Sequence, residues 1–281
     1  MNIEVLGTLD VRVNGVSVTP TAPKPRQVLA LLAFHAGQVV SVACLTEELW
    51  GAAPPRSART TLQTYVLQLR ELIAAALPGP SGDGPRRTAK EVLVTVPGGY
   101  LLDAGDGVSD AREFERLTAL GYRSMDAGDF RGAARQLRQA LDLWSGPAFA
   151  GVQAGEQLQA QARRLEETRL CALDRRIEAD LRLGRHRDLI AELTVLVSRY
   201  PTHETLRGQY MLALHRSGRR SEALETYQRL RATLVRELGL EPSADLRRIQ
   251  RLILTAGPGA PGESVPGRST GDGRERLVPT T

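Results

Sequence analysis

One phrase recurs three times in the second half of the 281-residue sequence and restricts what that half can fold into. In each copy, an apolar residue follows a glycine by five positions, and a second apolar residue follows four positions later. The copies begin at Gly128, Gly184 and Gly218. The last two glycines are 34 residues apart, the period of tetratricopeptide repeats, which are helix pairs that bury their apolar faces by stacking. The spacing therefore predicts an all-α, tetratricopeptide-like domain.

The same spacing predicts where the repeats are irregular. Gly128 and Gly184 are 56 residues apart, so we expect about 22 additional helical residues between them, near 151–173. Pro201 lies where the second helix of a repeat should end, and the corresponding Pro242 comes about seven residues late. Stacked repeats present a concave surface that binds proteins. A plain helical dimerisation domain is the alternative.

The first hundred residues differ, because strand signals flank three helical segments. Residues 3–18 alternate around Asn14-Gly15, a dipeptide typical of two-residue β-hairpins. Helices are predicted from Lys24-Pro25 to Gly37, from an N-cap at Ser41 to Trp50, and over 57–77. A second hairpin follows, with strands at 92–96 and 100–102. We therefore expect an N-terminal α+β winged helix-turn-helix within a mainly α chain.

The helix predicted over 57–77 carries the strongest functional signal. Its apolar residues follow the spacing of one buried stripe: Leu62, Val66, Leu69 and Ile73. An adjacent face collects the uncharged side chains of Thr61, Thr64, Tyr65 and Gln68, and the other flank carries Arg59, Gln63 and Arg70. No acid occurs between Arg56 and Arg70. This pattern suits a helix that reads base edges in the major groove, and a plain solvated face is the alternative.

The order of these segments resembles the winged-helix domain of the OmpR/PhoB type, in the variant that opens the Streptomyces antibiotic regulatory protein family. The matching residues run through the segment in order: Val5-Leu6-Gly7 with Leu9, 24–32, Leu45 with Leu49-Trp50-Gly51, Pro54-Pro55, Leu62-Gln63, Tyr65-Val66, Leu69-Arg70 and 99–102. The resemblance implies that the third helix binds DNA. Thr61, Thr64, Tyr65 and Gln68 would then face bases or adjacent phosphates, and Arg70 would lie near a phosphate.

The resemblance also implies further DNA contacts, and the sequence departs from the family pattern at two places. Lys24 and Arg26 are candidates at the start of the first helix. Leu67-Gln68 replaces a small polar residue followed by a cation, and glutamine at this position would favour adenine. Val96 replaces the usual basic residue before the wing turn. The remaining candidates for wing contacts are Lys90, Thr95 and the backbone of Gly98-Gly99, after the cations Arg86 and Arg87.

The helical half resembles the bacterial transcriptional activation domain, which follows the winged helix in that family. The matching residues are Asp110 with Phe114, Ala140-Leu141 with Leu143-Trp144 and Gly146-Pro147, 163–167, 179–181 with 183–185, Tyr200-Pro201 with Glu204, 211–214 with 217–219, Ala223-Leu224 with Tyr227, and 237–242. We therefore predict a winged helix over 1–104, a helical domain over 105–256 and a hinge of Gly and Asp at 103–110. The tail over 257–281, rich in Gly, Pro, Ser and Thr, is predicted to be disordered.

The family resemblance implies a sequence-specific DNA-binding transcriptional activator of a secondary-metabolite, or antibiotic, biosynthetic gene cluster. Such proteins are expected to bind direct repeats in promoter DNA, as side-by-side homodimers. They are also expected to recruit RNA polymerase holoenzyme through sigma and the alpha C-terminal domain. The alternative is a protein-interaction scaffold whose winged helix does not bind DNA, which predicts no salt-dependent binding to promoters.

Other function classes lack a motif in this sequence. It contains no P-loop, no GxSxG, no HExxH and no ligand cluster among its four histidines and two cysteines, so we expect no enzyme activity, no cofactor and no metal. No apolar run is long enough for a membrane span and no secretory signal is present. We therefore expect a cytoplasmic, nucleoid-associated protein. The net charge of +5 permits a nucleic-acid partner without requiring one.

Overall fold

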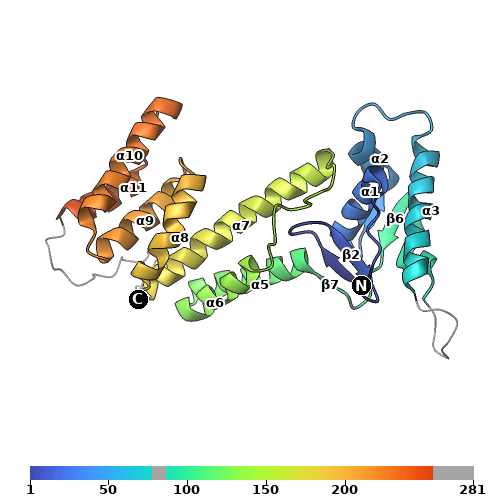
Figure 1. The fold of residues 1–281 in the computed structure, drawn as a ribbon, viewed down its shortest axis with the longest axis horizontal. Helices are drawn as coiled ribbons and strands as arrows, with labels where there is room; N and C mark the ends of the chain where they lie inside the picture. Colours follow the sequence, from blue (N-terminus) through green and yellow to red (C-terminus); the bar gives the residue numbers. More distant parts are fainter. Residues whose placement is uncertain (78–86, 256–281) are drawn as a thin grey trace, which may run out of the picture. The chain divides into compact units, whose positions relative to one another are not determined.

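The computed structural model describes residues 1–77 and 87–255 (Figure 1). The predicted disordered tail over 257–281 and the cation Arg86 lie outside these residues. The chain divides into two compact units, one from Met1 to Arg185 and one that begins at His186.

The first unit opens with a four-stranded sheet in the order β3-β2-β1-β7. Its strands are β1 (Asn2–Glu4), β2 (Asp10–Val13), β3 (Val16–Ser17) and β7 (Val108–Ser109). Between β2 and β3, Asn14 and Gly15 have φ values of 50° and 82°, as a two-residue hairpin turn with a right-handed strand twist requires. The hairpin predicted from Asn14-Gly15 is confirmed.

Along the chain, a winged helix follows β3 and precedes β7. It consists of α1 (Pro23–Phe34), β4 (Val39–Ser41), α2 (Val42–Trp50), α3 (Ala58–Ala76), α4 (Ala89–Val92), β5 (Leu93–Val96) and β6 (Gly99–Leu102). The second sheet has the order β4-β6-β5. The side chain of Ser41 accepts a hydrogen bond from the Cys44 N–H and so caps α2, as predicted. Residues 28–33 of α1 are all buried, because this helix is surrounded by the rest of the domain.

Three further helices complete the first unit: α5 (Asp110–Asp126), α6 (Phe130–Leu141) and α7 (Glu156–Arg182). Their buried residues Phe114, Leu137 and Leu165 belong to the same continuous core as Ile3 and Leu45 of the winged helix. Residues 103–110, predicted to form a hinge, contain strand β7, which pairs in parallel with β1. The connection between the winged helix and the helical region is therefore hydrogen-bonded and partly buried.

Two carboxylates, the half-buried Asp110 and the buried Glu48, fasten these parts of the first unit together. The side chain of Asp110 accepts hydrogen bonds from the N–H groups of Val5 and Leu6, both at 2.8 Å. The side chain of Glu48 in α2 accepts from the N–H of Gly155 at 2.6 Å and from the N–H of Leu158 at 3.0 Å. Because these groups belong to the first turn of α7, Glu48 caps a helix that begins more than a hundred residues later.

The second unit is helical over the residues that the structure describes. It comprises α8 (His186–Arg199), α9 (Glu204–Arg216), α10 (Arg220–Leu238) and α11 (Ala244–Thr255). α9 packs against α8, α10 and α11. Its buried residues Met211 and Leu214 form a core with Tyr227 and Leu230 of α10 and with Ile253 of α11.

The recurring glycine phrase marks the turns between consecutive helices. Gly128, Gly184 and Gly218 precede α6, α8 and α10, with φ values of 75°, 78° and 84°, where a side chain would strain the backbone. The apolar residues at both phrase positions are buried in every copy: Ala133, Leu137, Leu189, Leu193, Ala223 and Tyr227. The additional helical residues predicted near 151–173 lengthen α7, which has 27 residues. The mainly α, tetratricopeptide-like fold is confirmed.

Candidate nucleic-acid interface

Helix α3 is fixed in the first unit by its apolar stripe. Leu62, Val66, Leu69 and Ile73 are 1–2% exposed, as their spacing predicts. The stripe packs α3 against α1 and α2. Because one side of the helix is buried along its whole length, the opposite side must face outward.

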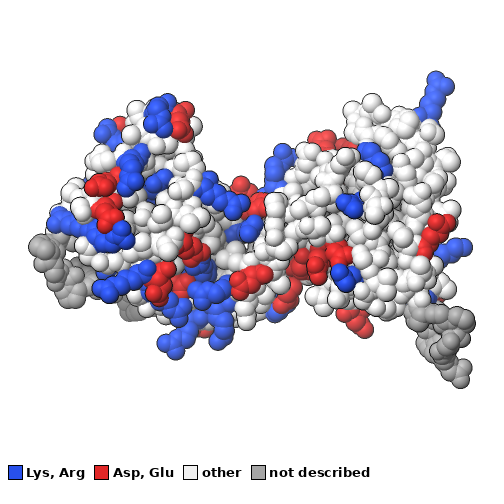
Figure 2. Space-filling model, in the orientation of Figure 1, with Lys and Arg blue, Asp and Glu red and all other residues white. Residues whose placement is uncertain are grey.

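The outward side of α3 carries uncharged polar side chains. Gln63, Thr64 and Gln68 are exposed, whereas Thr61 and Tyr65 are half-buried at the border of this face. The hydroxyl of Thr64 donates to the carbonyl of Thr60 at 3.1 Å, and its oxygen lone pairs remain able to accept. Much of the surface over α3 is therefore white in Figure 2.

The structure adds three residues to the exposed face that were not predicted as contacts. Thr60 is exposed one turn before Thr64, and Leu67 is 56% exposed beside Gln68. Glu71 is exposed one turn after Leu67 and is the first acid on this face. A helical projection at about 100° per residue places all three near Thr64, so their position on this face could have been predicted from the sequence. The acid-free part of the face ends at Glu71.

Arg70 joins α3 to the wing. Its guanidinium donates two hydrogen bonds to the carbonyl of Leu93, at 3.0 and 2.7 Å, and one to the hydroxyl of Thr95 at 2.7 Å. Leu93 and Thr95 belong to strand β5. Arg70 and Thr95, both predicted to contact DNA, therefore contact each other, and the arginine sets the position of the wing beside the helix.

The wing is the hairpin of β5 and β6. Gly98 is exposed at its turn with a φ of 79°, and its carbonyl accepts from the N–H of Val42 at 2.9 Å. Gly99 is buried, because its backbone lies against the carbonyl of Val40 in β4 and leaves no space for a side chain. Of these two predicted contact residues, only Gly98 presents its backbone at the surface.

The short helix α4 carries the cation nearest the wing in sequence. Lys90 is exposed on α4, which was not predicted. Glu91 accepts from the Thr88 N–H at 2.6 Å, and this hydrogen bond holds the pKa of the Glu91 carboxyl below its usual range. Glu91 and Thr88 cap α4 reciprocally, so the position of Lys90 follows from a capping box.

Lys24 and Arg26, which were predicted to contact DNA, and Arg87, which precedes the wing, form hydrogen bonds within the protein. Lys24 donates to the carbonyl of Leu49 at 2.6 Å, at the end of α2. Arg26 donates to the carbonyls of Pro20 and Gly151 at 2.8 and 3.1 Å. The structure thus gives Lys24 and Arg26 internal hydrogen-bond partners and does not place their charged groups on the exposed face of α3.

Arg87 also has an internal partner. It donates to the backbone carbonyl of Asp103 at 2.8 Å and forms an ion pair with the Asp103 carboxylate. A hydrogen bond from the Gly105 N–H, assisted by Arg87, keeps the pKa of the Asp103 carboxyl below its usual value. Arg87 therefore ties the start of α4 to the end of β6.

Arg59 differs from these cations. It is exposed in the first turn of α3, and no partner for its side chain occurs within residues 1–77 and 87–255. The structure thus brings Gln63, Thr64 and Gln68 together on the exposed face of α3, with Thr61 and Tyr65 at its edge, while Arg59 lies on the flank of the helix beyond Gln63.

The described residues form neither a metal site nor a membrane-spanning helix. Within residues 1–77 and 87–255, His, Cys, Asp and Glu form no group of three that could hold a metal ion. Over the same residues, every helix is too short or too polar to cross a membrane.

Two protein-family models match the chain. The model described as bacterial transcriptional activator domain matches residues 109–254. The model described as transcriptional regulatory protein, C terminal, matches residues 17–82. The second match includes α1, α2 and the whole of α3, so it covers the exposed face described above.

Individual relatives are similar over most of the chain. Regulatory protein DnrI of Streptomyces peucetius is 54% identical over 259 residues, which are 92% of this chain and 94% of DnrI. Regulatory protein AfsR of Streptomyces coelicolor is 36% identical over 255 residues, 90% of this chain but 24% of AfsR. The solved structure of Mycobacterium tuberculosis EmbR in complex with low affinity phosphopeptide has a TM-score of 0.81 and 33% identity, covering 90% of this chain and 64% of EmbR. The matched relatives are named as regulators, and neither family model is catalytic.

Proposed function

Because this chain belongs to the Streptomyces antibiotic regulatory protein family, in which an OmpR/PhoB-type winged helix precedes a bacterial transcriptional activator domain, we propose that it activates an antibiotic biosynthetic gene cluster by binding promoter DNA in a sequence-specific manner. One observation supports the DNA contact above all others. The exposed face of α3 carries uncharged polar side chains and no acid before Glu71, and on its flank Arg59 has no partner among residues 1–77 and 87–255.

In this proposal the first three turns of α3 enter the major groove. Glu71 lies at the end of the exposed face, where its carboxylate would repel phosphates if the helix entered further. Thr64 and Gln68 then read base edges, and the glutamine amide pairs well with adenine. Leu67, at 56% exposure, would contact a thymine methyl group.

Phosphate contacts give the complex its affinity. Arg59 of α3 and Lys90 of α4 are exposed cations and are the candidates for these contacts. The N–H of Gly98 at the wing turn is a further candidate for a phosphate contact. Arg70 contributes by holding the wing in position.

The remaining parts of the proposal concern assembly. We expect two copies of the chain to bind direct repeats side by side, and we expect the bound protein to recruit RNA polymerase through sigma and the alpha C-terminal domain. The site of action is then the nucleoid in the cytoplasm. The helical half of the chain matches the activator-domain model, and this match supports the recruiting role.

Two substitutions on α3 test the DNA-reading part of the proposal. Gln68→Ala should change base preference by about 1–3 kcal/mol at one position of the repeat, because it removes a base contact. Arg59→Ala should weaken binding to all DNA sequences, because it removes a phosphate contact. For the same reason, the slope of the logarithm of the binding constant against the logarithm of the salt concentration should fall in magnitude by about one. Gel shifts on a promoter fragment found by genome-wide footprinting, and on a version with scrambled repeats, separate these effects.

The matched control is Arg163→Ala, which removes an exposed arginine of α7 and should leave DNA binding unchanged. An equal loss of affinity for both fragments in Gln68→Ala would contradict base reading. Promoter binding that does not respond to salt in the wild type would contradict the proposal as a whole.

A further inference from the structure

Asp180 is a buried carboxylate surrounded by three arginines. Its side chain is 2% exposed and lies in the last turn of α7. Arg138 of α6 is 2.9 Å from it, Arg176 of α7 is 3.4 Å from it, and Arg185, just after α7, is 2.7 Å from it. Asp180 therefore neutralises only part of the positive charge of Arg138 and Arg185, which both pair with this one carboxylate.

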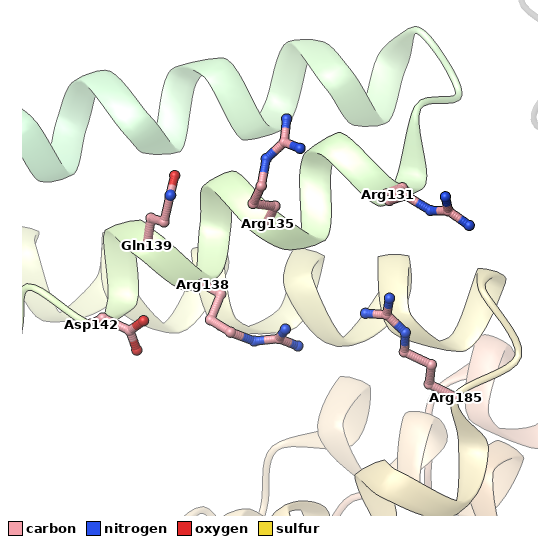
Figure 3. Close-up of a pocket in the computed structure, with 6 residues that line it drawn as sticks. All are labelled: Arg131, Arg135, Arg138, Gln139, Asp142 and Arg185. Carbon is pink, nitrogen blue, oxygen red and sulfur yellow. The ribbon is translucent and has the colours of Figure 1, made fainter.

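Two of these guanidiniums also face solvent. The side chains of Arg138 and Arg185 are 51% and 40% exposed and extend toward one another from α6 and from the end of α7 (Figure 3). Each guanidinium has five N–H donors, and Asp180 uses only part of them. The buried carboxylate orients both arginines in advance, which reduces the entropic cost of binding a second oxyanion.

The positive charge continues along α6. Arg131, Arg135 and Arg138 follow the i, i+4, i+7 spacing of one helical face and span about 10 Å. Arg131 and Arg135 are exposed and have no hydrogen bond or ion pair with any other described residue. Blue side chains gather over the position of α6 in Figure 2. We call Arg131, Arg135, Arg138 and Arg185 the α6 arginine face; with Gln139 and Asp142 they line a shallow cavity of about 210 Å³.

We propose that the α6 arginine face binds an acidic segment of a partner protein. Carboxylates of that segment would bind the free N–H groups of Arg138 and Arg185, and further carboxylates would follow α6 to Arg131. Arginine forks match carboxylate geometry and bind it with paired hydrogen bonds. This inference goes beyond the proposed function, because it concerns a surface on the activator-domain helices and does not depend on DNA reading by α3.

Size and position favour an acidic protein segment over other anions. The cavity of about 210 Å³ is smaller than the roughly 300 Å³ at which pockets for nucleotide-sized ligands begin. The 10 Å row of cations is longer than a single free phosphate can bridge, at about 1.5 Å of helix rise per residue. Within the first unit, α6 lies toward the end away from α3, so a duplex read by α3 is not the ligand (Figure 1).

Anisotropy of a fluorescent ten-residue glutamate peptide, titrated with the full-length protein, tests the inference. Arg131→Gln/Arg135→Gln should weaken binding about fivefold to tenfold, because two exposed charge pairs are lost. These two arginines do not contact Asp180, so the substitutions leave its ion pairs intact. The wild-type affinity should fall as salt is raised.

The matched control is Arg163→Gln/Arg251→Gln, which removes the same charge from exposed positions of α7 and α11 and should bind the peptide like the wild type. Equal weakening in both double variants would overturn the inference, because the attraction would then reflect net charge alone. Binding of a phosphoserine peptide without binding of the glutamate peptide would also overturn it, in favour of a phosphoryl ligand.

Promoter binding, measured on the same proteins by gel shift, separates this inference from the proposed function. We expect Arg131→Gln/Arg135→Gln to keep the wild-type affinity for the promoter fragment. A loss of promoter affinity with unchanged peptide binding would assign the face to DNA and overturn the inference. If the wild-type protein does not bind promoter DNA specifically, the proposed function fails, but the peptide titration still tests the α6 arginine face.

Discussion

Single residues hold the winged helix against the helices that follow it. Glu48 and Asp110 are carboxylates whose hydrogen-bond partners lie 107 and 105 residues away along the chain. Glu48 accepts N–H groups at the start of α7, where the helix dipole also favours a negative charge. Gly155 has no side chain, and the carbonyl of Glu48 occupies the place where a Cβ would lie. Each of these contacts predicts a measurable cost of substitution.

Glu48→Gln should destabilise the protein by about 1–3 kcal/mol, because an amide NH₂ would replace an oxygen that accepts a buried N–H. Glu47→Gln is the control: Glu47 is the exposed neighbour, and its substitution should change the free energy of unfolding by less than about 0.5 kcal/mol. Urea denaturation of the full-length variants measures both. Equal stabilities would contradict a capping role for Glu48.

Asp110 predicts a pH dependence. Burial raises the pKa of the Asp110 carboxyl above its ordinary value of 3.8, although the N–H groups of Leu6 and Val5 lower it in part. The folded protein then binds this proton more readily than the unfolded chain. Protonation of Asp110 therefore adds to the free energy of unfolding. This contribution is fully present below pH 3.8 and is lost as the pH rises through the raised pKa.

Asp110→Asn removes this titration while other carboxylates still titrate. On acidification from about pH 7 to about pH 4, the variant should therefore lose more stability than the wild type. The free energy of unfolding, measured across this range for both proteins, checks the sign. Parallel curves would contradict a raised pKa at Asp110.

At the scale of elements, Arg70 joins α3 to the wing and holds the two in a fixed relative position. Three hydrogen bonds run from its guanidinium to β5. Lysine could not replace this planar fork, since its ammonium is a single point of donation. The wing position therefore depends on a side chain of α3.

Arg70→Ala should lower the free energy of unfolding by about 1–2 kcal/mol, because it leaves the carbonyl of Leu93 without a charged donor. Arg59→Ala should change stability by less than about 0.5 kcal/mol, since Arg59 is exposed on the same helix. Thermal or urea unfolding distinguishes the two roles. Unchanged stability in Arg70→Ala would mean that the contact with β5 contributes nothing.

Local patterns in the sequence were sufficient to predict the elements that carry function. The stripe through Leu62 and Ile73 predicted which side of α3 is buried, and the spacing of the phrase that begins at Gly128, Gly184 and Gly218 predicted a tetratricopeptide-like fold, because both signals are visible as regular spacing in the sequence. β4 has three residues and α4 has four, too few for a periodic pattern. The partners of Arg70, Glu48 and Asp110 could not be predicted, because they depend on which distant backbone groups the fold brings into reach.

At the scale of the whole molecule, α3 and α5–α7 belong to one compact unit. The activator-domain model begins at residue 109, whereas the structural division falls after Arg185. The boundary given by the family models and the boundary between the compact units of the structure therefore lie at different residues. The reason is physical: β1 pairs with β7, and residues 145–150 bond to the backbone of residues 5–7.

The cap that Glu48 places on α7 also bears on how such regulators can be recombined. A hybrid gene with its junction near residue 104 would take position 48 from one parent and positions 155 and 158 from the other. Such a hybrid inherits a donor and an acceptor that were never selected together. A junction at the exposed Gly184 turn keeps all three positions within one parental half, so exchange of parts between related regulators is structurally least disruptive there.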